Sequence, residues 1–136
     1  MCADCLEFPI LVAALVIAAL AALLHVYIFA MESLWWTTRR VRATFGQTDA
    51  AAVGTRGMAF NQGFYNLFLA VVTVAGLIAY SLGDGAVGAA LVIAGAGSML
   101  AAAIVLILSD RTKASAAVKQ GTLPLIGLAL LALASL

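Results

Sequence analysis

Long apolar stretches without a charged side chain dominate the chain. The first three cover residues 8–31, 58–82 and 85–109, and each is long enough for a helix that crosses about 30 Å of hydrocarbon with about 20 residues. The last stretch, residues 123–136, is too short, so its helix has to begin upstream, near residue 114. The pattern therefore predicts four transmembrane helices, at about 8–34, 57–82, 85–109 and 114–136.

Two other interpretations of these stretches are disfavoured. A membrane β-barrel would alternate apolar and polar residues along each strand, and these runs do not alternate. A cleaved signal peptide would begin with basic residues, whereas the first run follows Asp4 and Glu7 and is longer than a signal sequence requires. We therefore expect an all-α, polytopic membrane protein that forms a single domain over residues 1–136.

The composition agrees with a membrane protein. Hydrophobic residues make up 65% of the 136 residues and charged residues 10%, whereas a soluble domain carries about 25% charged residues. The surplus apolar surface has to face a lipid bilayer. A formal net charge of +1 and the absence of a Lys/Arg stripe argue against nucleic acid as a partner.

The basic residues predict the orientation. All seven lie in the two loops that follow the first and third helices, or at the start of the fourth helix: Arg39, Arg40, Arg42, Arg56, Arg111, Lys113 and Lys119. Basic loops stay in the cytoplasm, so both termini should be extracytoplasmic, in a multi-pass protein of a bacterial inner (plasma) membrane. We expect Trp35 and Trp36 to lie in the interfacial aromatic belt. The segment 37–55 should form a short basic helix followed by a linker.

Small residues and cysteines have structural interpretations. Gly88, Gly95 and Gly97, together with Ala94, Ser98 and Ala102, predict close helix–helix packing, and we expect Gly97 and Ala101 to lie on the packed face. Cys2 and Cys5 precede the first helix, and two thiols without histidine partners are too few for a zinc site. We predict no metal site, and the sequence leaves the cofactor, if any, unknown.

Polar residues inside the predicted spans are the candidates for function. His25 and Glu32 are seven positions apart, which places them on one helix face. The second helix carries Gln62, Tyr65 and Asn66 on one face, with Asn61 beside them, and Gln120 lies at the start of the fourth helix.

Counted from Trp35 and Arg56, His25 and Asn66 should both lie about 15 Å from the same membrane edge. The pattern predicts a polar pocket in the cytoplasmic half. Its ligand-binding residues would be His25, Glu32, Asn61, Gln62, Tyr65, Asn66 and Gln120. Alternatively, the same residues would only form hydrogen bonds that hold the helices together.

Three blocks of sequence resemble a small bacterial membrane family catalogued as domain of unknown function 1304. The first block is His25-Val26-Tyr27-Ile28 followed by Glu32 and Trp35 or Trp36; the second is Asn61-Gln62-Gly63-Phe64-Tyr65-Asn66; and the third is Gln120-Gly121-Thr122-Leu123-Pro124. The resemblance extends from about Leu15 to the end of the chain. It implies four transmembrane helices and a role for the residues of these blocks, and it implies no activity.

Three classes of function stay open at this point. The first is binding or transport of a small molecule, a lipid or a proton in the polar pocket. The second is an intramembrane enzyme with the topology of the membrane proteins of glutathione and eicosanoid metabolism, although those pair an Asn with a Glu three positions later, and here Phe64 follows Asn61. The third is an accessory subunit, in a homo-oligomer or a larger membrane complex.

Overall fold

The computed structural model describes residues 4–135, with side chains described from Glu7 onward. Within these residues four helices are long and apolar enough to span a membrane: Glu7–Leu34, Asp49–Ser81, Gly85–Ser109 and Arg111–Leu133. This confirms the all-α fold with four spanning helices. The elements in chain order are α1 (Asp4–Phe29), η1 (Ala30–Leu34), α2 (Arg39–Phe45), α3 (Asp49–Ser81), α4 (Gly85–Ser109), η2 (Arg111–Lys113) and α5 (Ala114–Leu133).

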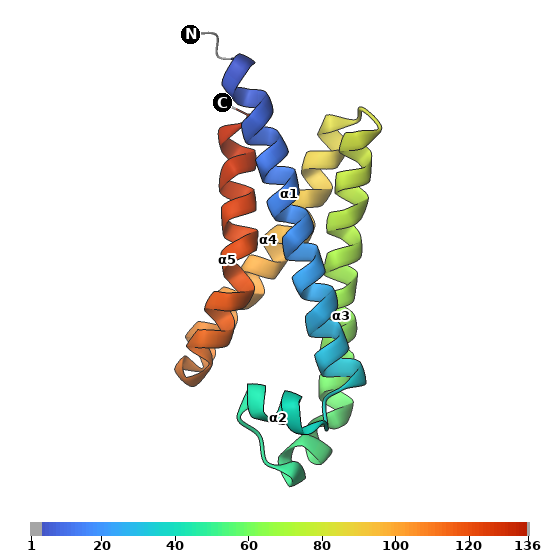
Figure 1. Cartoon of the computed structure of the whole chain (residues 1–136), viewed down its shortest axis with the longest axis vertical. Helices are drawn as coiled ribbons and strands as arrows, with labels where there is room; N and C mark the ends of the chain where they lie inside the picture. Colours follow the sequence, from blue (N-terminus) through green and yellow to red (C-terminus); the bar gives the residue numbers. More distant parts are fainter. Residues whose placement is uncertain (1–3, 136) are drawn as a thin grey trace.

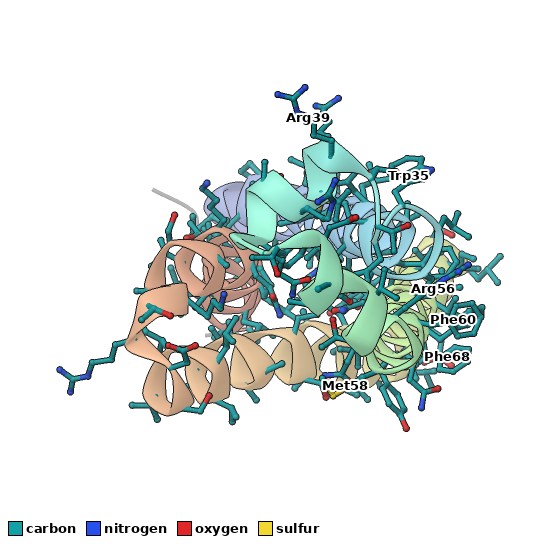
Figure 2. All side chains as sticks on the ribbon, turned by 90° about the horizontal axis from the view of Figure 1, so that it is seen from below. Trp35, Arg39, Arg56, Met58, Phe60 and Phe68 are labelled. Atoms are coloured by element: carbon teal, nitrogen blue, oxygen red, sulfur yellow. The ribbon has the colours of Figure 1, made fainter. Side chains whose placement is uncertain are left out.

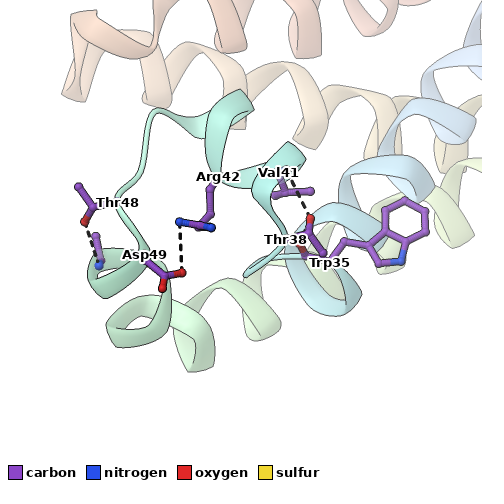
Figure 3. Close-up of polar contacts among 7 residues, drawn as sticks. Trp35, Thr38, Val41, Arg42, Thr48 and Asp49 are labelled. Atoms are coloured by element: carbon purple, nitrogen blue, oxygen red, sulfur yellow. Dashed lines mark hydrogen bonds and ion pairs between the residues drawn. The ribbon is translucent and has the colours of Figure 1, made fainter.

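The second spanning helix, α3, is longer than predicted. It begins at Asp49 rather than near residue 57, because Thr48 caps it: the Thr48 hydroxyl accepts a hydrogen bond from the Ala51 backbone N–H at 3.2 Å. Gly46, with a φ of 64°, ends α2 in the left-handed conformation that glycine adopts without strain. The predicted linker therefore shrinks to residues 46–48, and Figure 3 shows this short connection between α2 and α3.

The helices form a ring in which each packs against two neighbours. α1 lies beside α3 and α5, α4 also lies beside α3 and α5, and α1 and α4 cross each other with few contacts (Figure 1). α1 begins and α5 ends at one end of the bundle, which we call the terminal end. α2 and η2 lie at the opposite end, which we call the loop end.

Glycines set the closest approach between α3 and α4. A Cβ on Gly76 would lie 2.7 Å from the backbone nitrogen of Val92, and a Cβ on Gly95 would lie 2.8 Å from that of Thr73. Gly88 is packed in the same way against Tyr80 and Gly76. Gly88 and Gly95 therefore pack closely on α3, as the sequence predicted, whereas the prediction is wrong for Ala94, Ser98 and Ala102, which are exposed.

The prediction for Gly97 is wrong. A Cβ on Gly97 would meet no atom within 4 Å, and Ala101 is exposed. Successive helical residues turn by about 100°, so Gly97 points about 200° away from Gly95. The two glycines cannot share one packed face.

The loop end is closed by α2, which confirms the predicted short basic helix. Its Val41 and Phe45 pack against Ile28 of α1, against Met31 of η1 and against Ala52 and Ala59 of α3. Lys113 of η2 donates a hydrogen bond to the Phe45 carbonyl at 3.2 Å, which ties α2 to the second loop. In the same loop, hydrogen bonds from Thr112 to the Asp110 carboxylate lower the pKa of Asp110.

The two tryptophans have different environments. Trp35 is 46% exposed and points away from the bundle (Figure 2), which agrees with an interfacial position. Trp36 is buried, and its indole N–H donates a hydrogen bond to the Thr55 hydroxyl at 3.2 Å. The expectation that Trp36 belongs to an outer aromatic belt is therefore wrong, because its ring packs on Phe45 of α2.

Candidate functional site

Glu32 and Asn66 form the one side-chain pair among the predicted residues that the structure brings together. The Asn66 amide donates a hydrogen bond to Glu32 Oε2 at 2.9 Å and a second one to the Gln62 carbonyl at 3.1 Å. Glu32 and Asn66 are half-buried between α1 and α3. The pair thus holds a carboxylate inside a spanning segment, at its loop end.

A π-helical turn positions Glu32. In η1 the backbone N–H of Trp35 donates to the carbonyl of Ala30 at 3.0 Å, five residues earlier, so the last turn of the first span is wider than an α-helix. The next residue, Ser33, donates from its hydroxyl to the Phe60 carbonyl of α3 at 2.9 Å. Turns of this kind occur often at functional sites, and the residue pattern alone did not predict this one.

Gly63 allows α3 to approach this turn. A Cβ on Gly63 would meet the Ser33 hydroxyl and would lie 3.1 Å from both the Phe29 carbonyl oxygen and the Ser33 nitrogen. The rings of Phe29 and Phe64 close the contact edge to face, with centroids 5.1 Å apart. The glycine in the second family-like block therefore has a structural role beside Asn66.

His25 is completely buried, at 0% exposure. Its Nδ1 lies 2.9 Å from the Ala21 carbonyl oxygen, which can only accept, so Nδ1 carries a proton and donates it. The other ring nitrogen, Nε2, is buried and has no hydrogen-bond partner among the described residues. A neutral imidazole in this arrangement presents an unpaired acceptor to the interior of the bundle.

His25 and Asn66 lie at similar depths, but their side chains do not pair. α1 and α3 run in opposite directions, and Gly63 packs between Phe29 and Ser33, so Asn66 is about level with residue 28, three residues or about 5 Å from His25. The Asn66 side chain instead reaches toward the loop end and pairs with Glu32.

Gln120 falls level with His25. A Cβ on Gly127 of α5 would lie 3.4 Å from the Ala18 nitrogen of α1, and the two helices run in opposite directions. Gln120 is seven residues before Gly127, and His25 is seven residues after Ala18, so both lie about 10 Å from this contact toward the loop end. Gln120 is half-buried.

The other predicted site residues point away from the interior. Asn61, Gln62 and Tyr65 are exposed on α3, Tyr65 at 60%. Phe60 and Phe68 of the same helix are also exposed and project outward in Figure 2. The structure therefore divides the predicted cluster into an inner part (His25, Glu32, Asn66 and Gln120, called the inner polar set below) and an outer part.

Two cavities lie elsewhere in the structure. One of about 350 Å³ is lined by Tyr27, Trp35, Thr38, Arg40 and Val41 at the loop end. The other, of about 280 Å³, lies between apolar residues near the terminal end, such as Leu11, Ile93 and Leu131. Sequence reasoning missed the first cavity, although Tyr27, Trp35 and Arg40 are each of a type that favours a membrane interface.

Metal ligands do not cluster in the part of the chain that the structure describes: no group of three His, Cys, Asp or Glu residues there could hold an ion. Cys2 and the side chain of Cys5 lie outside the described residues.

Four apolar spanning helices around a small set of buried polar side chains define a multi-pass α-helical membrane protein. The model of the family described as Protein of unknown function (DUF1304) matches residues 19–132, and the chain belongs to this family. The match includes all residues of the inner polar set. No curated protein and no solved structure matches the chain.

Proposed function

We propose that this protein binds a small polar or amphiphilic molecule within the membrane, between the inner polar set and the loop end. The observation that carries the proposal is the unpaired Nε2 of the fully buried His25. A buried polar atom without a partner costs about 1–3 kcal/mol. A ligand that donates a hydrogen bond to Nε2 would recover this free energy.

Glu32 supports the same proposal. A charged side chain inside a membrane costs about 2.5–3.5 kcal/mol at mid-helix, and such residues usually mark function. The Asn66 amide engages one of the two carboxylate oxygens. The second oxygen is left for a cationic or hydrogen-bonding group of a ligand that enters from the loop end.

Binding is favoured over passage through the bundle. Beyond His25, toward the terminal end, Thr73 is the one buried polar side chain among the described residues, and its hydroxyl already donates to the Leu69 carbonyl at 2.9 Å. A proton or solute path across the membrane needs a continuous chain of polar groups or water. The polar groups stop halfway, so we assign the site to binding, or to chemistry on a bound molecule, at one side.

The exposed residues of α3 favour a second function, as a subunit of an oligomer or a larger membrane complex. Asn61, Gln62 and Tyr65 are polar and lie on the outer surface of a spanning helix. Polar side chains that face another helix form interhelical hydrogen bonds worth about 0.6 kcal/mol on average. A partner on this surface would satisfy them, and a partner-bound protein would migrate as a larger particle in mild detergent.

The test of the binding proposal compares small molecules that remain bound during purification. The full-length protein is extracted in native lipid nanodiscs, and the bound compounds are identified by mass spectrometry. We expect one compound to accompany the wild type and to be lost from His25→Ala and from Glu32→Gln. Gln keeps an acceptor oxygen for Asn66, so the second variant retains the internal hydrogen bond.

Gln62→Ala is the matched control, because Gln62 is exposed on the neighbouring turn of α3. It should retain the compound. If no compound distinguishes the wild type from both variants while all three proteins unfold at the same temperature, the binding proposal is wrong. The subunit function would then be the better account.

A further inference from the structure

The cavity of about 350 Å³ at the loop end joins an aromatic wall to a cationic edge. Tyr27 and Trp35 form the wall, with ring centroids 6.4 Å apart at an interplanar angle of 63°. Arg40, from the first turn of α2, forms the edge. We call this cavity the interface groove.

The groove is held in shape by the turn before α2. The Thr38 hydroxyl donates to the Trp35 carbonyl at 2.7 Å and accepts from the Val41 backbone N–H at 3.4 Å, the second of which is drawn in Figure 3. Val41 is 4% exposed and belongs to the core at the loop end. The relative positions of Trp35 and Arg40 are therefore fixed by the fold.

Arg40 is free to bind an anion. Arg42 forms an ion pair with Asp49 at 3.2 Å (Figure 3), and this is the one ion pair found among the described residues. Arg40 takes no part in this ion pair, and within that part of the chain Trp35 is hydrogen-bonded through its backbone and not through its indole N–H. The groove thus offers a guanidinium and an N–H donor without a bound acceptor.

The position of the groove matches the surface of a lipid leaflet. The rings of Tyr27 and Trp35 lie 6.4 Å apart, so they differ in depth by no more than that distance. The headgroup region of one leaflet is about 5–8 Å deep. A groove of this depth, with Arg40 at its outer edge, covers the headgroup region and the start of the acyl chains.

We propose that the interface groove binds one anionic phospholipid of the leaflet at the loop end. The guanidinium of Arg40 pairs with the phosphate, because its planar set of N–H donors can form two parallel hydrogen bonds with phosphate oxygens. The indole N–H of Trp35 donates to the headgroup or the ester, and the rings of Trp35 and Tyr27 contact the first part of an acyl chain. This site is separate from the inner polar set and does not depend on the function proposed for it.

The experiment is a lipid titration of the full-length protein in detergent, read by native mass spectrometry. The probes are dioleoylphosphatidylglycerol, dioleoylphosphatidylcholine and inorganic phosphate. The wild type should bind one phosphatidylglycerol in preference to phosphatidylcholine. One basic residue near an anionic surface contributes about 1 kcal/mol, so Arg40→Gln should weaken phosphatidylglycerol binding about fivefold.

Arg39→Gln is the matched control, because it removes the same charge from the adjacent exposed residue, which projects outward in Figure 2 and does not line the groove. It should change the affinity less than twofold. Trp35→Ala should weaken the binding of both lipids, because it removes the aromatic wall.

Equal losses from Arg39→Gln and Arg40→Gln would show diffuse attraction by the basic segment and would overturn the proposal. Displacement of the lipid by inorganic phosphate at the same concentration would assign the groove to a free anion instead. Arg39 and Arg40 are both exposed, so unfolding temperatures within a degree or two of wild type are expected for their variants. The proposal would also be overturned if the folded wild type bound neither lipid.

Discussion

At the residue scale, the sequence predicted the contacts of some polar side chains of the spanning helices and failed for others. Glu32 and Asn66 were predicted to share one site, and the structure joins them by a direct hydrogen bond. Gln62 and Tyr65 were assigned to the same face of α3 as Asn66, and both are exposed. A turn of about 100° per residue separates Tyr65 from Asn66, which is enough to place one outside and the other inside.

The coupling between Glu32 and Asn66 is measurable with a double-mutant cycle. We expect Asn66→Ala to destabilise the wild type and to have a smaller effect in a Glu32→Leu background, with a coupling free energy of about 0.6–1.7 kcal/mol. The measurement is reversible unfolding in mixed micelles. Additive effects of the two substitutions would mean that the hydrogen bond contributes nothing to stability.

At the element scale, apolar runs predicted the spans well, while polar segments at their ends did not. α4 begins and ends where its uncharged run does, at Gly85 and Ser109. The extra turns of α3 before residue 57 depend on the Thr48 cap and on packing of Ala52 under α2, which a hydropathy pattern does not reveal. The π-helical turn η1 likewise depends on contact with Gly63, a residue of another helix.

Close packing of α3 on α4 is tested with a pair of glycines on α4. Gly95→Leu should destabilise the protein by about 1–3 kcal/mol or more, because the new side chain would overlap the Thr73 backbone. Gly97→Leu is the control and should leave the unfolding temperature unchanged, since the position is open. Thermal unfolding in detergent measures both variants, and equal losses of stability would contradict an orientation of α4 that turns Gly95 toward α3 and Gly97 away from it.

The contact between α3 and the π-helical turn has its own test. Gly63→Ala should lower the stability by about 1–3 kcal/mol, because backbone atoms of Phe29 and Ser33 lie within 3.1 Å of the added carbon. Gly57→Ala on the same helix meets nothing within 4 Å and should raise stability by up to about 1 kcal/mol through helix propensity. A neutral Gly63→Ala would show that the turn tolerates a side chain there.

At the scale of the whole molecule, the arrangement of the helices limits what the inner polar set can do. The ring order of α1, α3, α4 and α5 places His25 in the interior and closes the terminal half with mainly aliphatic residues, Thr73 being the buried polar side chain there. Sequence patterns predicted the number of spans and the identity of His25, Glu32 and Asn66 as intramembrane polar residues. They could not predict which neighbours each residue meets, because the register between helices depends on small-residue contacts such as that of Gly127 with Ala18.

The orientation in the membrane stays a prediction of the positive-inside rule. It is tested with single cysteines at Ala50, in the first turn of α3, and at Leu82, directly after its last residue; both positions are exposed. Cys2 and Cys5 are replaced by Ser in both variants. A membrane-impermeant thiol reagent added to intact cells should label Leu82→Cys and leave Ala50→Cys unlabelled until the membrane is permeabilised. The reverse result would place both termini in the cytoplasm.

The central claim, that a ligand pairs with the buried ring of His25, is tested most directly by ¹⁵N NMR, because the chain contains one histidine. Protein labelled with ¹⁵N-histidine is compared in native lipid nanodiscs and after delipidation in detergent. The account predicts a protonated Nδ1 in both samples and an Nε2 resonance that moves to the hydrogen-bonded range in the native sample alone. An Nε2 resonance that is the same in both samples would contradict it.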